Sequence, residues 1–293
     1  MKRLLITGAG KRSFIGRSLA EALHNEYEIL APTRSELDLR DELKVNEYFK
    51  TNPVDIVIHC AIHVPMHHGA EHEADSDLRM FFSLENCSEY YNKLIYFGSG
   101  AEYDKRYDVC QVKEDEIGRS LPTTEYGLAK YVMNKYARLS ANIYNLRLFG
   151  VFGPYEGYTV KFISGLCCKA IMGLPLTIRQ NCYFDFMYID DLVNIVRWAI
   201  EETPRFKDYN LCTGIRMDLV SIAKIVYRIS KKNLKIEVLN KDMNKEYTGN
   251  NHRLMSELKG YRLIPLEEAV ELLYNYYLNH VDDICIDSLV KNV

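Results

Sequence analysis

The sequence alternates short apolar runs with longer segments of helical periodicity, and this alternation restricts the folds that the chain can adopt. The segments with helical periodicity are 41–50, 75–91, one that starts near Phe14 and one that starts near Thr124. The five runs that predict strands are Arg3–Thr7, Tyr27–Ala31, Asp55–Ala61, Lys93–Gly98 and Asn142–Leu148. Because successive strand–helix units bury a parallel sheet between helices, the sequence predicts a doubly wound α/β fold.

A glycine-rich loop follows the first predicted strand. It contains Gly8, Gly10 and Gly16 and leads into the first helical segment. In dinucleotide-binding folds, the amides of such a loop and the N-terminus of the next helix receive a pyrophosphate. Gly8 and Gly16 stand further apart than in the usual spacing, and Ser13 replaces a middle glycine, so a simple turn would explain the loop equally well. Its position at the first strand-to-helix junction favours the dinucleotide site.

Basic residues gather near the end of the second predicted strand. Arg34 follows this strand, and Lys11 and Arg12 of the glycine loop are expected to approach the same place. An acidic residue there would bind the ribose 2′-hydroxyl of NAD, whereas an arginine accommodates the 2′-phosphate of NADP. The sequence therefore favours NADP(H), with NAD as the alternative cofactor. If these arginines bind no cofactor, they are solvated residues on the surface.

Tyr126 and Lys130 have the spacing of neighbours on one face of a helix. A nearby ammonium favours the phenolate and lowers a phenol pKa that starts at about 10, so such a tyrosine can exchange a proton with a carbinol or ketone. Ser99, at the end of the fourth predicted strand, can hydrogen-bond the same substrate oxygen. The three residues predict a proton-transfer site for carbonyl or alcohol redox chemistry, although an isolated pair with this spacing is more often structural.

Five histidines lie between His59 and His72, and His68 and His72 have the helical spacing of metal ligands. No complete ligand set accompanies them, so no metal site is predicted. A polar loop on the substrate side is expected instead, with His63 as a candidate substrate contact.

The composition is that of an ordinary globular protein, with 293 residues, 47% hydrophobic residues and a net charge of -3. This charge argues against a nucleic-acid or anionic-membrane partner. No apolar run reaches the roughly 20 residues of a membrane span, and the segment before Gly8 is too short for a signal peptide. The eight cysteines form no C-x-x-C pair, and together these features predict a reduced cytoplasmic enzyme.

Several motifs, in order, resemble the extended short-chain dehydrogenase/reductase family of nucleotide-sugar epimerases, dehydratases and reductases. They are the Thr7-Gly8 loop, Cys60-Ala61 after the third strand, Ser99 with Tyr103, Tyr126 with Lys130, and the segments 147–154, 185–191 and 209–214. The last three are similar to the family's R-x-x-N-V-Y-G-P, D-F-x-Y-V-D-D and Y-N-x-G-x-G segments. The resemblance covers most of the chain. It implies a Rossmann doubly wound parallel sheet with a smaller α/β substrate-binding domain.

The resemblance also implies a discontinuous division of the chain. Residues 1–153 with about 183–208 would form the dinucleotide-binding domain, and about 154–182 with 209–293 would form the nucleotide-sugar-binding domain. Helices 75–91 and 124–140 correspond to the family's dimer interface, so a homodimer is expected. The tail 281–293 is expected to be an extension or partly disordered.

The resemblance assigns Ser99, Tyr126 and Lys130 as the catalytic residues, with Tyr126 as general acid or base. The residues expected to bind the cofactor are Gly8, Gly10, Lys11, Arg12, Ser13, Phe14, Ile15, Gly16, Arg34, Asp38, Leu39, Cys60, Ala61, Lys130 and Leu148. The residues expected to contact the substrate are His63, Gly100, Arg179, Arg216 and Arg253. Guanidinium groups suit a diphosphate, although each arginine would suit a surface ion pair equally well. Phe184 replaces the family arginine that usually binds the diphosphate.

The residues beside the catalytic three restrict the reaction that the resemblance implies. Family dehydratases place an Asp-Glu pair where this chain has Gly100 and Ala101, which carry no proton. Segment 33–41 is similar to that of the NADPH-dependent GDP-fucose synthases, but the cysteine and histidine that those enzymes use for epimerisation are absent. The remaining reaction is NADPH-dependent reduction of the C4 ketone of a nucleotide-linked 4-keto(-6-deoxy) sugar, in surface-polysaccharide synthesis. An NAD-dependent 4-epimerase is the alternative function. A catalytically idle sensor that binds a dinucleotide is a third possible function.

Overall fold

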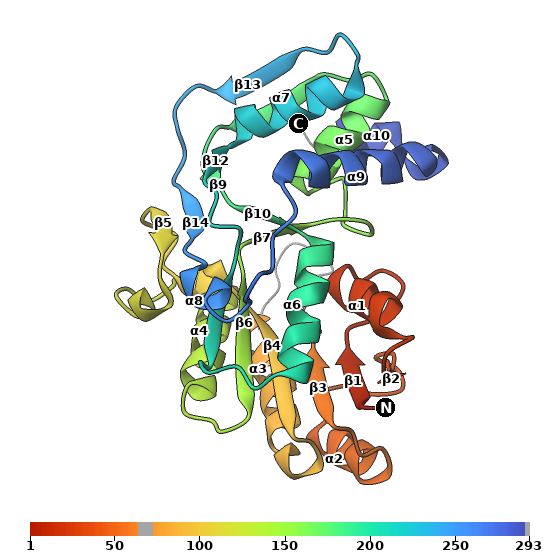
Figure 1. The fold of residues 1–293 in the computed structure, drawn as a ribbon, viewed down its shortest axis with the longest axis vertical. Helices are drawn as coiled ribbons and strands as arrows, with labels where there is room; N and C mark the ends of the chain where they lie inside the picture. The colour runs from red at the N-terminus through yellow and green to blue at the C-terminus, as the bar shows by residue number, and fades with distance from the viewer. Residues whose placement is uncertain (64–72, 291–293) are drawn as a thin grey trace.

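The computed structural model describes residues 1–63 and 73–290. These residues form a large parallel sheet flanked by helices and, at the upper end of the view in Figure 1, a second group of small sheets and helices. In the described ranges, no helix combines the length and the apolar character needed to span a membrane.

The large sheet is parallel throughout and has the strand order β11-β6-β4-β3-β1-β2. Its strands are β1 (Arg3–Thr7), β2 (Glu28–Leu30), β3 (Ile56–His59), β4 (Lys93–Ser99), β6 (Ile143–Leu148) and β11 (Asp208–Leu211). This order confirms the predicted doubly wound α/β fold. The chain passes from β1 to β2 and then returns to the other side of β1, so the switch point of the sheet lies between β1 and β3.

Helices cover both faces of the large sheet, which explains why its strands read as nearly continuous apolar runs. Leu4 and Ile6 of β1 face one core, and Leu5 between them faces the other. The core of Leu4 contains residues of α1 and α6, and the core of Leu5 contains residues of α2, α3 and α4. These helices are α1 (Ile15–Leu23), α2 (Glu42–Thr51), α3 (Glu73–Glu85), α4 (Glu125–Ala137) and α6 (Ile189–Glu201).

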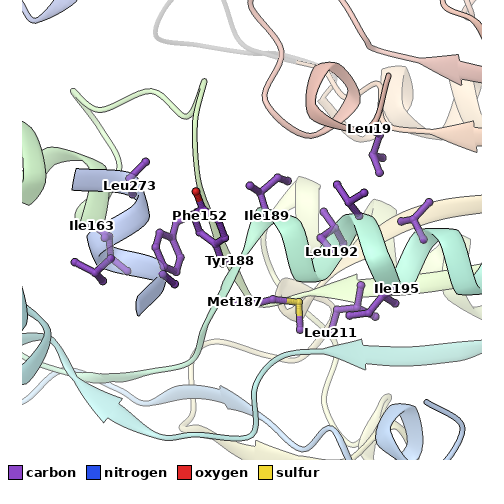
Figure 2. Close-up of a cluster of buried hydrophobic side chains, with 14 of the residues drawn as sticks. Leu19, Phe152, Ile163, Met187, Tyr188, Ile189, Leu192, Ile195, Leu211 and Leu273 are labelled. Carbon is purple, nitrogen blue, oxygen red and sulfur yellow. The ribbon is translucent and has the colours of Figure 1, made fainter. Parts of the chain in front are cut away.

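The core beside α1 and α6 continues into the second group of elements. Figure 2 shows Leu19 of α1 and Leu192 of α6 in the same apolar cluster as Ile163 and Leu273. Ile163 belongs to α5 (Phe162–Ile171) and Leu273 to α9 (Leu266–Asn279). The large sheet and the C-terminal helices therefore share one core.

The second group contains small sheets built from segments far apart in the sequence. β7 (Gly150–Phe152) pairs with β10 (Phe186–Tyr188), and β8 (Leu176–Gln180) pairs with β13 (Ile236–Asn240). A further sheet has the order β12 (Met217–Asp218), β9 (Tyr183–Phe184), β14 (Tyr247–Gly249) and β5 (Val109–Val112). The remaining helices are α7 (Leu219–Ser230), α8 (His252–Met255) and α10 (Ile286–Val290). α10 packs on α5 with Leu289 buried, so the described part of the tail is largely helical.

Several boundaries differ from those expected from the sequence, among them the end of α3 and the domain boundary near residue 208. The helix expected over 75–91 ends at Glu85, because the Cys87 amide bonds the Leu84 carbonyl in a tighter turn and the Tyr91 hydroxyl donates to the same carbonyl at 2.8 Å. β11 belongs to the large sheet and reaches Leu211, beyond the boundary expected near 208. The division into two domains stays a prediction, with this strand on the side of the large sheet.

Candidate active site

At the switch point between β1 and β3, the backbone of the glycine loop lies against the backbone of the chain after β3 and of the first turn of α1. Gly8 has a φ of +68°, and a Cβ there would lie 2.7 Å from the Ala61 amide nitrogen. A Cβ on Gly16 would lie 2.3 Å from the Gly8 carbonyl oxygen. Both positions therefore require glycine, and the loop, the end of β3 and the N-terminus of α1 come together at one place. This is where a doubly wound sheet receives the pyrophosphate of a dinucleotide.

Thr7 and His59 fix the ends of β1 and β3 beneath this loop. The Thr7 hydroxyl accepts hydrogen bonds from the amides of Cys60 (3.2 Å) and Ala61 (3.3 Å). Its own proton then goes to His59 Nδ1, 2.9 Å away, because both of its acceptor positions are used. Burial, and then the charge of Lys130, lower the pKa of His59 to about 3. His59 is thus a neutral structural histidine.

Three charged residues surround the place where the adenosine end of a dinucleotide is expected. Arg40 binds Asp38 at 2.6 Å, and its hydrogen bond is the main cause that holds the pKa of Asp38 well below its usual range. Arg34 lies 3.6 Å from Asp38, and its side chain is 70% exposed. Arg40 was not singled out from the sequence. Leu39 packs in the core and is 5% exposed, so its side chain presents little surface to a ligand.

The other residues expected to bind the cofactor lie around the same end of the sheet. Gly10, Lys11 and Arg12 are exposed in the loop, and Ser13 Oγ accepts the Arg17 amide at the start of α1. Partly buried side chains follow at Phe14, Ile15, Cys60 and Leu148.

Ser99 and the pair Tyr126 and Lys130 come from neighbouring elements. Ser99 ends β4, and its Oγ accepts the Ala101 amide at 3.1 Å, which caps the 3-10 turn Gly100–Glu102. Tyr126 and Lys130 lie on α4, with the Lys130 ammonium 5.7 Å from the centroid of the Tyr126 ring. Lys130 is only 2% exposed. A buried ammonium beside a phenol suits a proton-transfer site.

Gly127 allows α4 to approach the turn after Ser99. A Cβ there would lie 2.5 Å from the Ala101 carbonyl oxygen. Thr124 begins the helix, and its hydroxyl accepts the Gly127 amide at 3.1 Å. The first turn of α4, which carries Tyr126, is thus held against the residues that follow Ser99. Gly127 was not singled out from the sequence, although a glycine inside a helical pattern often has a packing reason.

A buried ionic network lies beneath Ser99. Glu102 accepts the Ser99 amide at 3.1 Å and pairs with Arg147 at 2.8 Å, and Arg147 also pairs with Asp208 at 2.8 Å. The side chains of Arg147 and Glu102 are fully buried. Burial opposes the charge of Arg147, but the two carboxylates hold its pKa above the ordinary value. The network joins β4, β6 and β11 under the turn that follows Ser99.

The residues expected to contact the substrate fall into different environments. The His63 amide donates to Asp77 at 2.7 Å, and a Cβ on Gly100 would lie 2.4 Å from the Tyr247 hydroxyl oxygen. Arg179 lines a cavity of about 520 Å³ together with Lys161 and Lys169. The two other arginines are held in ion pairs: Arg216 binds Glu246, and Arg253 binds Asp208, Asp115 and Glu114. Arg179 is thus the one of the three arginines that lines this cavity.

Aromatic rings occupy the neighbourhood of Phe184, where the resemblance led us to expect an arginine. Phe184 stacks on Phe186 with ring centroids 4.6 Å apart and contacts Tyr247 at 5.0 Å. Tyr247 in turn contacts Phe149 at 5.2 Å. A continuous row of rings therefore runs from the end of β6 to β10.

No group of three or more potential metal ligands occurs in the parts of the chain that the structure describes. Of the five histidines in the sequence cluster, His59 and His63 are described, whereas His67, His68 and His72 lie outside the described residues.

A buried carboxyl group lies on the loop after β7. Glu156 is 7% exposed, and its carboxyl accepts the Ser164 hydroxyl of α5 at 2.6 Å. Burial raises the pKa of Glu156 to about 7. Folding therefore favours the protonated form, so this residue contributes most stability below the ordinary glutamate pKa, and the contribution is lost as the pH rises towards 7.

We expect Glu156→Gln to be more stable than the wild type by about 3 kcal/mol at pH 8, with the difference vanishing at about pH 4. The amide keeps an acceptor for Ser164 but does not ionise. Urea unfolding at both pH values measures the difference. Glu89→Gln, at an exposed position, is the control and should show no such pH dependence. A stability difference that is equal at both pH values contradicts the assignment.

The doubly wound parallel sheet and the glycine cradle at its switch point are typical of dinucleotide-binding α/β proteins. Residues 4–212 match the model of the NAD dependent epimerase/dehydratase family. The chain belongs to this family of nucleotide-sugar-modifying enzymes.

Similar proteins include GDP-sugar synthases and a nucleotide-sugar 4-epimerase. GDP-L-colitose synthase of Yersinia pseudotuberculosis is 21% identical over 94% of this chain and 98% of its own. The NADP-bound GDP-L-fucose synthetase of Naegleria fowleri has a TM-score of 0.83 at 15% identity, covering 96% of this chain and 94% of its own. UDP-glucose 4-epimerase of Thermotoga maritima, solved with UDP-glucose, has a TM-score of 0.81 at 21% identity, covering 95% and 99%. These likenesses support the fold.

Proposed function

We propose that the protein reduces the C4 ketone of a nucleotide-linked 4-keto(-6-deoxy) sugar with NADPH. The observation that supports this proposal is the close approach of α4, which carries Tyr126 and Lys130, to the turn that follows Ser99. A ketone oxygen held there meets a hydroxyl from β4 and a phenol from α4. The relatives named as GDP-sugar synthases support the same class of substrate.

Each catalytic side chain has a distinct task in this proposal. Tyr126 donates its proton to the sugar oxygen as the alcohol forms, and the buried ammonium of Lys130 stabilises the phenolate that remains. Ser99 donates a hydrogen bond that orients the same oxygen. The hydride is supplied by the reduced nicotinamide when the cofactor is bound. Lys130 is also the residue proposed to hold the nicotinamide ribose.

The nucleotide part of the substrate is proposed to occupy the cavity that Arg179 lines. Lys161 and Lys169 line it as well, so three cationic side chains face one space of about 520 Å³. Guanidinium and ammonium groups of this kind suit the negative charge of a diphosphate. Arg216 and Arg253, which were also expected to bind the substrate, hold carboxylates of the protein instead.

The cofactor preference follows from the residues after β2. These are Ala31, Pro32, Thr33 and Arg34, and the exposed guanidinium of Arg34 after this strand supports a contact with the 2′-phosphate of NADP. We expect Arg34→Ala to weaken NADPH binding by about 10- to 100-fold and NADH binding by less than about twofold, because one charge-assisted contact to the 2′-phosphate is lost. Fluorescence titration with each cofactor measures both values.

Arg228→Ala, which removes an exposed guanidinium from α7, is the matched control and should change neither affinity. Equal losses for NADPH and NADH in Arg34→Ala would show that Arg34 does not bind the 2′-phosphate. NAD that copurifies with the wild type and resists dialysis would favour the 4-epimerase instead, because an epimerase restores its cofactor in every turnover.

The cellular setting is part of the same proposal. All eight cysteines are unpaired, which suits a reducing cytoplasm. The described chain packs α3 against α4, and we propose that these two helices form the interface of a homodimer, as the family resemblance suggests. A pathway of bacterial surface-polysaccharide synthesis is the proposed source of the 4-keto sugar.

A further inference from the structure

Tyr247 lies against the turn that follows Ser99, although it is far from Ser99 in the sequence. It belongs to β14, in the small sheet beside β5 and β9, and it is 8% exposed. Its ring packs between Phe149 and Phe184, and the Lys105 ammonium lies 4.8 Å from the ring centroid. The ring is therefore held from several sides, so the position of its hydroxyl is well defined.

The Tyr247 hydroxyl reaches the backbone of the turn that contains Ser99. A Cβ on Gly100 would lie 2.4 Å from the hydroxyl oxygen and 2.7 Å from the ring carbon that carries it. The Ser99 side chain, next to Gly100, lies close enough to this hydroxyl to influence the pKa of the Tyr247 phenol. A side chain at position 100 would collide with Tyr247, so glycine is required there. Tyr247 covers the Cα of Gly100.

The hydrogen bonds of Ser99 determine where its proton points. A serine hydroxyl has two acceptor positions and one donor. The Ala101 amide occupies one acceptor position at 3.1 Å. Burial raises the pKa of the Tyr247 phenol, so it stays protonated and able to donate. When Tyr247 fills the second acceptor position, the Ser99 proton is left to point at a third group.

We infer that Tyr247 is a positioning residue that directs the Ser99 hydroxyl proton towards the substrate oxygen. This inference rests on the proposed function, since Ser99 must donate to a sugar oxygen for its direction to matter. Tyr247 acts through Ser99 and is not itself a proton carrier in the reaction. The contact joins Tyr247 on β14 to the turn after β4, two parts of the chain that are far apart in the sequence. The proposed catalytic site is therefore complete only when β14 is packed against this turn.

The test removes only the hydroxyl group, with Tyr247→Phe. We expect kcat to fall by about three- to tenfold, as for the loss of one neutral hydrogen bond, with unchanged NADPH affinity and an unchanged melting temperature. The double variant with Ser99→Ala should be no slower than Ser99→Ala alone, because both changes act through one hydroxyl. The substrate probe is a GDP-linked 4-keto-6-deoxyhexose, followed by NADPH consumption.

Tyr103→Phe is the matched control, because its ring also contacts Phe149 while its hydroxyl donates to Asn210 and to the Lys113 carbonyl. It should lower stability and leave kcat unchanged. Wild-type kcat in Tyr247→Phe, or losses that multiply in the double variant, would overturn the inference.

A wild type that consumes no NADPH with the probe overturns the proposed reductase, and the variants are then compared in the epimerisation of UDP-glucose with NAD. A crystal structure of the wild type decides the inference without any activity. A Tyr247 hydroxyl within hydrogen-bonding distance of Ser99 Oγ supports it, and a greater separation overturns it.

Discussion

Replacing Tyr126 with phenylalanine is expected to lower kcat by about 10²- to 10⁴-fold, the usual contribution of a general acid. The change removes the proton donor and leaves the ring beside the Lys130 ammonium, 5.7 Å from its centroid in the wild type. NADPH affinity should therefore stay within about twofold of the wild type, because the glycine cradle at Gly8 and Gly16 is untouched. NADPH consumption with a GDP-linked 4-keto-6-deoxyhexose and cofactor titration measure the two quantities.

Tyr131→Phe, on the same helix, is the matched control for this prediction and should keep full activity. Full activity in Tyr126→Phe would show that another group supplies the proton. A wild type that binds the dinucleotide tightly but turns over no probe in either direction would favour the idle sensor among the functions weighed from the sequence.

The second large effect concerns stability. Replacing Arg147 with methionine should lower the free energy of unfolding by about 3–5 kcal/mol, because it leaves the buried carboxylate of Glu102 without a cation. Asp208 keeps its pairs with Arg138 and Arg253. The Arg147 side chain is fully buried, so water does not replace the lost contacts. Urea unfolding of the variant and the wild type at neutral pH measures the change.

An exposed pair provides the control for this prediction. Arg119, with 76% of its side chain exposed, pairs with Glu116, and Arg119→Met should cost only about 0–1 kcal/mol. Adding Glu102→Gln to Arg147→Met should restore part of the loss, since the uncompensated charge of Glu102 disappears. A loss below about 1 kcal/mol for Arg147→Met alone would mean that the network contributes little to stability.

Local signals in the sequence were sufficient for five of the six described strands of the large sheet, all except β11. Short apolar runs separated by helical periodicity predicted β1, β2, β3, β4 and β6, because both faces of a parallel sheet are buried and its strands must be apolar. Helix boundaries were less predictable. The end of α3 depends on the Tyr91 hydroxyl and the Leu84 carbonyl, a contact that periodicity does not encode.

In the site, residues related by local spacing were predictable from the sequence, whereas contacts between residues far apart in the chain were not. Tyr126 and Lys130 were recognisable because their spacing brings them together on any helix. Arg253 looked like a diphosphate ligand, yet the fold places it 2.9 Å from Asp208 and 2.6 Å from Asp115. No sequence pattern distinguishes an arginine that binds a ligand from one that meets a carboxylate elsewhere in the chain.

The sequence by itself determined the doubly wound sheet, the glycine loop after β1 and the helix that carries Tyr126, because each depends on residues close together in the chain. Only the tertiary structure decided what surrounds Ser99. Tyr247, Arg147 and Asp208 reach that turn from β14, β6 and β11, and the packing of those strands sets their positions. The free energy that brings them there comes from the shared apolar core, which forms only when the whole chain has folded, and the buried ion pairs fix which polar groups meet.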